Sequence, residues 1–300
     1  MSIHEDEVGT DVALVERLLR GQHPELADAG VTLLGSGTDN TMYRLGRDLL
    51  IRLPRTAETV AALEKELRWL PHLSAHLDHT IPTPLHVGEP TAEFPLPWAI
   101  YRWIDGDLPS AASVTDWATY GKDLASFVAE LHAIDVPSEE SRDGLSWYRG
   151  GLLPPHDEWV RECLAEIAQL NTDVDTDVLA RYWSEALQVP PPTAPHVWLH
   201  GDLRPSNVLV SAGRLRAVID FGGLSVGFPD AEHAPTWDLP AVARDTYRAE
   251  LALDEPTWLR ARAWAIMVGA SGVPYYWETY PDFADECLRR LQAIVDEGHR

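Results

Sequence analysis

The chain has few cysteines, few basic side chains and no long apolar run among its 300 residues. Its two cysteines, Cys163 and Cys287, lack ligand-like spacing, so they support neither a disulfide framework nor a zinc site. No apolar stretch approaches the roughly 20 residues that span a bilayer. The acidic segment 1–7 is also unlike a basic secretory signal. We therefore expect a cytoplasmic protein without a membrane partner.

The scarcity of basic side chains excludes a further class of partner. There are 24 lysines and arginines against 47 aspartates and glutamates, and the formal net charge is −23. Nucleic-acid binding requires a positive footprint, so we expect no nucleic-acid partner. An acidic surface would instead raise the local concentration of a cationic small molecule. The alternative is that the charge serves only solubility or reflects adaptation to salt.

Residues 200–210 and 219–222 form the most informative part of the sequence, because they contain Asp202, Asn207 and Asp220 in that order. Phosphoryl transfer needs a base that orients a hydroxyl and oxygen ligands for Mg²⁺, while the protein mainly positions the reactants and neutralises charge. Asp202 lies in a proline-containing loop and fits the role of the base. Each residue alone is also explained as a turn former, hairpin residue or strand cap. Their joint order and spacing favour a phosphoryl-transfer site.

A β-hairpin is predicted between Asn207 and Asp220. Two short apolar runs are separated by the glycine-containing turn 211–214. Pairing Val210 with Leu215 places Asp220 one diagonal step from Asn207, about 7–8 Å away between backbone positions. Mg²⁺ takes one or two such side-chain oxygens and completes its shell with water and phosphate oxygens. Asn207 and Asp220 are therefore the predicted metal ligands.

The motif H-G-D-x-x-x-x-N, followed by a hairpin and I-D-F, resembles the aminoglycoside phosphotransferase family, which is related to the protein kinases. The resemblance implies that Asp202 is the catalytic base, that Asn207 and Asp220 hold Mg²⁺, and that ATP or GTP donates phosphate. It also implies an α+β, protein-kinase-like fold of two lobes. The β-rich N-terminal nucleotide-binding lobe spans 1–104, with a hinge at about 98–105. The mainly helical C-terminal lobe, 105–300, carries the catalytic loop, the metal loop and the acceptor site.

A small-residue loop precedes the second predicted strand of the N-terminal lobe. The resemblance makes Ser36, Gly37 and Thr38 of this loop contacts to the nucleotide phosphates, because glycine lets backbone N–H groups approach closely. An ordinary hairpin turn explains the same residues.

Arg52 lies on the third predicted strand, where the family usually has a phosphate-binding lysine. Arginine keeps the positive charge but presents a planar fork instead of a point charge. By the resemblance, Glu64 on the following helix, at about 57–77, pairs with Arg52 and holds it toward the phosphates. Glu66 is the alternative partner, and a solvated charge without a partner is the other interpretation of either residue.

The segment 97–106 is the predicted hinge between the lobes. In the family, backbone groups here pair with the nucleotide base. We therefore expect contacts from the backbone near Arg102 and Ile104, with Tyr101 at the back of the pocket. An edge strand with an aromatic packing face is the alternative. Backbone recognition leaves no side-chain signature, so the choice between ATP and GTP is open.

Helical periodicity in the C-terminal lobe recurs at 116–134, at 156–188 and from Leu239 onward. After the metal loop, Asp230 and Glu232 are predicted to brace the catalytic loop by hydrogen bonds. The aromatic and acidic segment 274–280 lies between two predicted helices. It would serve as a wall for a glycosidic ligand, or simply pack where helices meet.

These features predict a phosphotransferase that moves the γ-phosphate of ATP or GTP to a hydroxyl of a small molecule. The leading acceptors are an aminoglycoside or a macrolide antibiotic. An aminoglycoside would be a cationic acceptor. One alternative is a metabolic kinase on the same fold that acts on an amino alcohol, a sugar or a hydroxylated amino acid. Another is a nucleotide-binding regulator without catalysis. Arg52 favours it, as do Phe228 and Glu232, which stand where the family usually has other residues, whereas the intact Asp202, Asn207 and Asp220 oppose it.

Overall fold

The computed structural model describes residues 7–37 and 39–298 and divides the chain into two compact units. The first unit comprises residues 1–106 together with 217–222, and the second comprises 107–216 together with 223–300. The predicted lobe boundary after Ile104 lies close to the first break. The sequence did not predict that 217–222, which include Asp220, group with the first unit.

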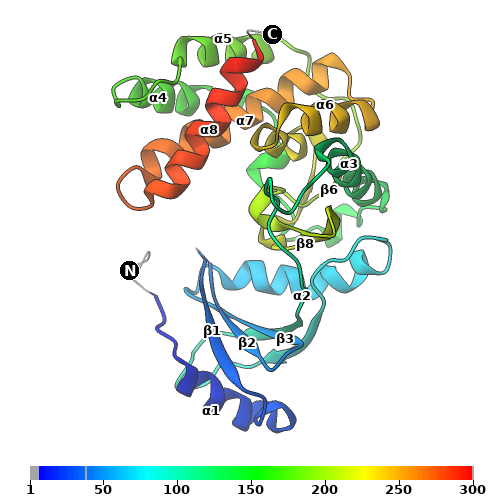
Figure 1. Ribbon diagram of the computed structural model, residues 1–300, viewed down its shortest axis with the longest axis vertical. Coiled ribbons are helices and arrows are strands. Elements are labelled where there is room, and N and C mark those ends of the chain that lie inside the picture. The colour runs from blue at the N-terminus through cyan, green and yellow to red at the C-terminus, as the bar shows by residue number, and fades with distance from the viewer. Residues whose placement is uncertain (1–6, 38, 299–300) are drawn as a thin grey trace. The chain divides into compact units, whose positions relative to one another are not determined.

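The first unit is built on a five-stranded antiparallel sheet between two helices (Figure 1). The strands follow the order β1-β2-β3-β5-β4, and every neighbouring pair is antiparallel. The elements are α1 (Val12–Gln22), the 3-10 turn η1 (Pro24–Leu26), β1 (Val31–Ser36), β2 (Asn40–Leu45), β3 (Leu49–Pro54), α2 (Val60–Ser74), β4 (Pro84–Gly88) and β5 (Trp98–Arg102).

Helix α1 covers one face of this sheet because its apolar side chains lie on one stripe. Asp11 caps the helix by accepting a hydrogen bond from the N–H of Leu14 at 2.7 Å. Leu14, Leu18 and other buried residues of α1 pack against Ile51 and Ile100 of the sheet. Alternate strand residues point to the opposite face, where α2 lies (Figure 1). The two faces of the sheet therefore have separate environments.

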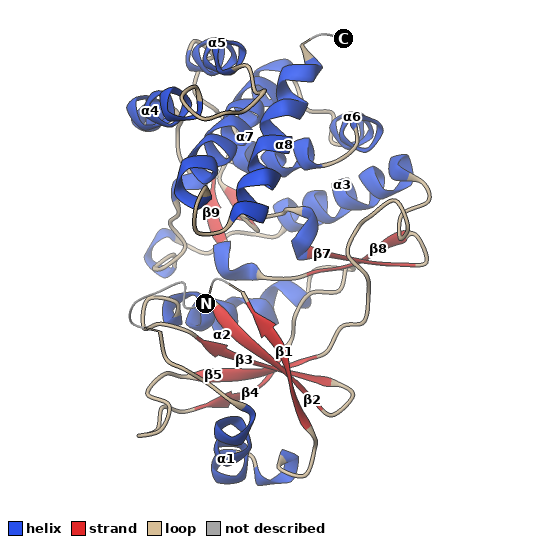
Figure 2. Ribbon diagram, turned by 60° about the vertical axis from the view of Figure 1, so that its left-hand side comes forward, coloured by secondary structure: helices blue, strands red, loops and turns tan. Residues whose placement is uncertain are grey.

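The second unit is mostly helical, with two short strand pairs (Figure 2). Its long helix α7 (Glu255–Tyr276) is buried along most of its length and packs against α4, α5 and α8. The other elements are α3 (Trp117–Ala133), the 3-10 turns η3 (Tyr148–Gly150), η5 (Pro205–Asn207) and η7 (Pro229–Asp238), α4 (Asp157–Ile167), α5 (Thr176–Leu187), β6 (Val197–Leu199) with its partner β9 (Ser225–Gly227), β7 (Val208–Ser211) with its partner β8 (Arg214–Val218), α6 (Ala241–Glu250) and α8 (Pro281–Glu297).

The predicted α+β fold is confirmed, with an antiparallel sheet followed by a mostly helical region. The predicted hairpin is also present as β7 and β8, and its turn uses Ala212 and Gly213, both at positive φ. Two positive φ angles fit the twist of a two-residue hairpin loop. The helical region 156–188 contains two helices, α4 and α5, because the polar segment between them forms turns. Among the described residues, no helix is both long and apolar enough to cross a membrane.

Candidate active site

The predicted catalytic residue Asp202 lies in a loop of the second unit that its own neighbours hold in place. Asn207, at the end of η5, donates from Nδ2 to the Asp202 carbonyl at 2.8 Å and to its Oδ2 at 3.2 Å. The N–H of Asp202 donates to Nδ1 of His200 at 3.2 Å. These contacts fix both the backbone and the carboxylate of Asp202. They also use the amide nitrogen of Asn207 and leave its oxygen as the atom suited to a metal ion.

Glu232 anchors the start of this loop. Its two carboxylate oxygens accept hydrogen bonds from the N–H groups of His200 and Gly201, both at 2.9 Å. Gly201 has a φ of +82°, and a Cβ there would lie 2.4 Å from the carbonyl oxygen of Gly223. Only glycine fits such a position without strain. The bracing role predicted for Glu232 is therefore confirmed by these two hydrogen bonds.

Asp230 does not share this role, so its predicted contact with the catalytic loop was wrong. Its Oδ2 forms an ion pair with Nε of Arg260 at 3.0 Å, on helix α7. The side chain lines a pocket of about 110 Å³ with a largely apolar wall, which includes Leu153 and Trp264 but neither Asp202 nor Asn207. The two side chains therefore have different partners: Asp230 pairs with Arg260, whereas Glu232 binds the backbone of His200.

Arg149, in η3, is a site residue that the sequence did not reveal. Its Nη1 donates to Oδ1 of Asp202 at 2.8 Å and to the Gly201 carbonyl at 2.7 Å. Its guanidinium carbon lies 4.5 Å from the centre of the Trp147 ring. The side chain is 15% exposed, so this ion pair is largely shielded from solvent. Arg149 therefore holds Oδ1 of the Asp202 carboxylate, while Asn207 holds Oδ2.

The charges around Asp202 keep its carboxylate ionised. Burial alone would raise the pKa of Asp202, but the charge and hydrogen bond of Arg149 oppose it. Arg204 and His200 add to this effect, and the pKa of Asp202 is lowered below its usual value. The loop therefore presents a carboxylate that can accept a hydrogen bond from a hydroxyl at neutral pH.

We expect the substitution Arg149→Met to raise the pKa of Asp202, because burial then acts without the opposing charge. The acid limb of the pH–activity profile should move to higher pH, whereas Arg149→Lys should restore part of the shift. The measurement is kcat/KM for phosphate transfer from about pH 4, the ordinary pKa of an aspartate, to about pH 8. A limb moved upward by the substitution then enters the measured range, while that of the wild type lies at or below its lower end. An unmoved acid limb in Arg149→Met would contradict the assigned electrostatic role.

In the first unit, Arg52 lies in a buried network on the α2 face of the sheet. Its Nη1 donates to both carboxylate oxygens of Glu66, at 3.1 and 2.9 Å, and its Nη2 lies 3.4 Å from Oδ1 of Asp220. Tyr101 donates its hydroxyl to Oε2 of Glu66 at 2.7 Å. Burial would lower the pKa of Arg52, but the charge of Glu66 holds it above its usual value. Arg52 thus carries a permanent positive charge beside the predicted metal ligand Asp220.

The partner of Arg52 is Glu66, so the preferred pairing with Glu64 was wrong. Glu66 is 1% exposed and continues the buried stripe of α2 formed by Leu63, Leu70 and Leu73, whereas Glu64 is exposed. On a helix, residues three and four apart share a face. Position 66 is three residues after Leu63 and faces the sheet, while position 64 faces solvent.

Glu66→Ala and Glu64→Ala form a matched pair for testing this network. Removing Glu66 leaves the guanidinium buried without its carboxylate, which typically costs about 3–5 kcal/mol of folding free energy. It should also raise the KM for the nucleotide. Glu64→Ala should change stability by no more than about 0.5 kcal/mol. Urea unfolding and nucleotide kinetics measure both effects, and equal behaviour of the two variants would show that the network has no special role.

The loop expected to hold phosphates is closed as a hairpin turn in its described part. The N–H of Gly37 donates to the Asn40 carbonyl at 2.9 Å, and the hydroxyls of Ser36 and Thr41 lie 3.2 Å apart. Thr38 lies outside the described residues. The hydrogen bond of Gly37 fits the alternative reading of an ordinary turn, because it occupies the N–H that a phosphate would need.

At the predicted hinge, β5 ends at Arg102 and Ile104 lies in the loop that follows. The N–H of Arg102 donates to the Thr83 carbonyl at 3.1 Å, so this group is already paired within the first unit. Tyr101 is buried, and its hydroxyl bonds to Glu66, as described above. The role of Tyr101 visible in the structure is thus to support Glu66.

Asn207 and Asp220 both offer oxygen atoms that suit Mg²⁺. The amide nitrogen of Asn207 donates to Asp202, so the amide oxygen is the atom that can bind a metal ion. The side chain of Asp220 is 54% exposed, and its backbone has a φ of +64°, a conformation rare for residues other than glycine. Such a strained backbone at a predicted ligand fits a functional constraint. Amide and carboxylate oxygens are the donors that Mg²⁺ prefers.

The aromatic segment predicted as an acceptor wall lies where α7 ends and α8 begins. Tyr275 and Tyr280 are 74% and 46% exposed. Phe283 stacks on Tyr280, and the guanidinium of Arg204 in the catalytic loop lies 4.5 Å from the Phe283 ring centre. Arg204 also donates to Oε2 of Glu286 at 2.6 Å. This corner therefore contacts the loop that carries Asp202.

The sheet and helix of the first unit, with a catalytic loop and hairpin in a mostly helical second unit, define a kinase-like fold. Residues 30–264 match the phosphotransferase enzyme family, APH. The chain therefore belongs to this family, which confirms the resemblance found in its sequence. No curated protein sequence matches the chain.

Solved structures show the same fold at low sequence identity. The GDP complex of wild-type aminoglycoside 2'-phosphotransferase-IIIa is 20% identical, with a TM-score of 0.75, and the match covers 96% of this chain and 100% of that chain. The GDP and kanamycin complex of APH(2")-IIia is 19% identical, with a TM-score of 0.70, covering 96% and 99%. Macrolide 2'-phosphotransferase MphH from Brachybacterium faecium, an apoenzyme, is 21% identical, with a TM-score of 0.60, covering 95% and 97%.

Proposed function

We propose that this phosphotransferase moves the γ-phosphate of ATP or GTP to a hydroxyl of an aminoglycoside or macrolide antibiotic. The observation that carries the proposal is the preorganised loop around Asp202. Arg149 and Asn207 hold its carboxylate, and Glu232 anchors the backbone before it. A protein that only binds nucleotide has no chemical need for an aspartate held in this way.

In the proposed reaction, Asp202 accepts a hydrogen bond from the acceptor hydroxyl and takes its proton as the oxygen attacks the γ-phosphorus. The new O–P bond forms while the bond between the γ-phosphorus and the β–γ bridging oxygen breaks, and the nucleoside diphosphate leaves. Asn207 and Asp220 would hold Mg²⁺, which neutralises charge on the phosphate oxygens. The guanidinium of Arg52, held by Glu66, would stabilise the phosphates in the same way.

The surface beside the catalytic loop supports a cationic, sugar-like acceptor. Three exposed acidic residues, Glu278, Asp282 and Asp285, lie close in sequence to the exposed Tyr275 and Tyr280, while Glu286 pairs with Arg204. Aromatic faces suit the apolar faces of sugars, and clustered carboxylates attract positive charge. Structural relatives include proteins described as aminoglycoside and macrolide phosphotransferases, which agrees with this class of acceptor.

A nucleotide-consumption screen tests the proposal. The purified protein is incubated with Mg²⁺ and either ATP or GTP, and with aminoglycosides, macrolides or small amino alcohols. The variant Asp202→Asn is the control for contaminating kinases. Acceleration by aminoglycosides or macrolides, absent in Asp202→Asn, is the expected result. Acceleration by amino alcohols alone would identify a metabolic kinase, and no acceleration by any acceptor would identify a nucleotide-binding regulator.

A further inference from the structure

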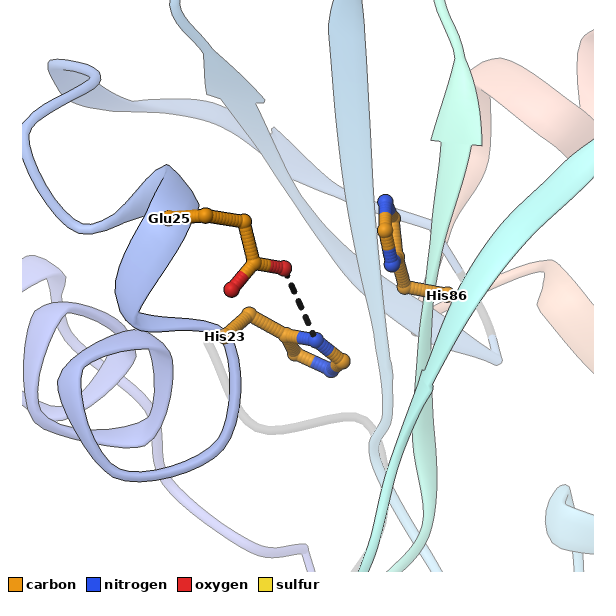
Figure 3. A group of neighbouring side chains, drawn as sticks. All are labelled: His23, Glu25 and His86. Atoms are coloured by element: carbon orange, nitrogen blue, oxygen red, sulfur yellow. Dashed lines mark ion pairs between the residues drawn. The ribbon is translucent and has the colours of Figure 1, made fainter.

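Two histidines and a glutamate meet at a corner of the first unit that has no role in the proposed reaction. His23 follows the last residue of α1, Glu25 lies in η1, and His86 lies on the edge strand β4 (Figure 3). The ligand atoms that these three side chains offer all lie within 4.8 Å of one another. His86 pairs with Ile100, so it lies on the α1 face of the sheet, away from Arg52 and Glu66.

The backbone around this cluster is held in place by several hydrogen bonds. Gln22 donates from Nε2 to the Glu89 carbonyl at 2.9 Å and accepts from the Glu89 N–H at 2.7 Å. The N–H of His23 donates to the Leu19 carbonyl at 2.7 Å, which ends α1. The end of α1 is thereby tied to the end of β4, so the side chains of His23 and His86 start from fixed positions.

The hydrogen bonding of His23 determines which of its nitrogens faces the cluster. Its Nε2 lies 3.1 Å from the Val87 carbonyl, which can only accept, so Nε2 carries the hydrogen. Its Nδ1 then faces Oε1 of Glu25 at 3.7 Å. When only Nε2 carries a hydrogen, Nδ1 presents a lone pair beside the carboxylate oxygen, and a bound cation would satisfy both acceptors. A metal-binding histidine typically donates its other ring N–H to a carbonyl in this way.

We propose that His23, Glu25 and His86 bind one transition-metal ion of the Zn²⁺ type. Metal-to-nitrogen and metal-to-oxygen bonds of about 2.0–2.2 Å place two ligands on a tetrahedral ion about 3.3–3.6 Å apart. The observed 3.7 Å between Nδ1 of His23 and Oε1 of Glu25 is near this range. Two imidazoles and one carboxylate favour Zn²⁺ over Mg²⁺ or Ca²⁺, which prefer all-oxygen sites.

The ion would connect α1 to the edge strand of the sheet. The side chain of Glu25 is 58% exposed, so a fourth position is open to water. Because His86 is on β4 and His23 ends α1, one ion would crosslink two segments that are 63 positions apart, in addition to the bonds of Gln22. We therefore expect the ion to stabilise the first unit and to leave phosphate transfer unchanged.

Calorimetric titration of the chelator-treated full chain with ZnCl₂, in an excess of Mg²⁺, tests the site. The expected result is one Zn²⁺ bound per chain. Glu25→Gln and His86→Gln should each weaken binding by at least about tenfold, since even the loss of a supporting partner costs 10–100-fold. Glu25→Gln is the more informative of the two variants. The side chain of Glu25 is exposed, so replacing it should not disturb folding. As a second readout, Zn²⁺ should raise the Tm of the wild type and not that of Glu25→Gln.

A control is needed because exposed histidines one helical turn apart also bind Zn²⁺. His72, in the last turn of α2, and His76, two residues after the end of that helix, form such a pair, with ring centres 4.6 Å apart. His76→Gln should keep the wild-type affinity and the wild-type shift in Tm. No binding at micromolar Zn²⁺ would overturn the proposal and leave His23 and Glu25 as a simple ion pair. Equal binding by wild type, Glu25→Gln and His86→Gln, or loss of binding only in His76→Gln, would overturn it as well.

Discussion

Replacing Asp202 with alanine is expected to lower the rate of phosphate transfer by about 10²–10⁴-fold, the usual contribution of a positioned general base. The reason is that the carboxylate both orients the acceptor hydroxyl and accepts its proton. Nucleotide affinity should change far less, because the backbone carbonyl of Asp202, which alanine keeps, still accepts the hydrogen bond that orients Asn207. Initial rates with a saturating acceptor and a separate nucleotide-binding titration distinguish the two quantities.

The alanine variant also leaves Arg149 without its carboxylate, so a second substitution is needed. Asp202→Asn keeps an oxygen that can accept from Nη1 of Arg149, and it should preserve the fold while losing the base. Asp173→Ala, at an exposed loop position, is the matched control and should keep full activity. Full turnover by Asp202→Asn would show that Asp202 is not the base.

The second large effect is a loss of stability in mild acid, caused by two buried histidines of the second unit. His132 on α3 and His233 in η7 have ring centres 6.0 Å apart, and Nδ1 of His233 lies 2.8 Å from the Tyr247 hydroxyl. Burial lowers the pKa of His132 to about 4. Burial, together with the neighbouring His132, lowers the pKa of His233 to about 3.

The direction of the effect follows from proton binding. Between about pH 6.5 and pH 4 the unfolded chain takes up a proton at each histidine, and the folded chain does not. Above about pH 6.5 the histidines are neutral in both states, so the free energy of unfolding is not reduced by them. It should fall by about 1.4 kcal/mol per pH unit for each histidine as the pH decreases toward the folded pKa values. Urea unfolding at a series of pH values measures this slope.

His132→Phe isolates the contribution of one histidine. Within the described residues, Nε2 of His132 has no hydrogen-bond partner, so phenylalanine removes the titration without breaking a bond there. The free energy of unfolding of this variant should depend less steeply on pH than that of the wild type. The difference should be up to about 1.4 kcal/mol per pH unit, which corresponds to one proton. Burial raises the pKa of Asp230 and of Glu232, which acts in the opposite direction, but these groups are common to both proteins. His76→Gln, at an exposed position, should keep the wild-type slope, and an unchanged slope in His132→Phe would contradict the assignment.

The part of the site that was predictable from sequence is the part held by local contacts. Asn207 reaches the carbonyl of Asp202 five positions away, and the hairpin that follows is short. The order and spacing of these residues in the sequence therefore predict most of their arrangement in space. The spacing also contained the signal for Glu66, since it lies three residues after the buried Leu63. The neighbouring Leu67 is only partly buried, because the buried face of the helix runs through positions 63, 66, 70 and 73.

The remaining contacts had no signal in the sequence because they join distant segments without periodic structure. Arg149 lies in a single 3-10 turn, 53 positions before the aspartate that it binds. Nothing in its neighbours distinguishes it from a surface arginine. The cluster of His23, Glu25 and His86 also depends on how the end of α1 meets the edge strand. The placement of 217–222 with the first unit likewise follows from long-range packing, including the N–H of Val218 on the Thr80 carbonyl.

The Arg52 network has a practical consequence for chemical labelling. Protein kinases present a lysine amine on this strand, and amine-directed nucleotide analogues acylate it or form an imine with it. A guanidinium offers no such nucleophile, so these reagents should not modify β3 of this protein. The chain has only two lysines, Lys65 and Lys122. Lys65 is next to Glu66 on α2, and burial lowers its pKa, so it is the lysine with the more reactive amine.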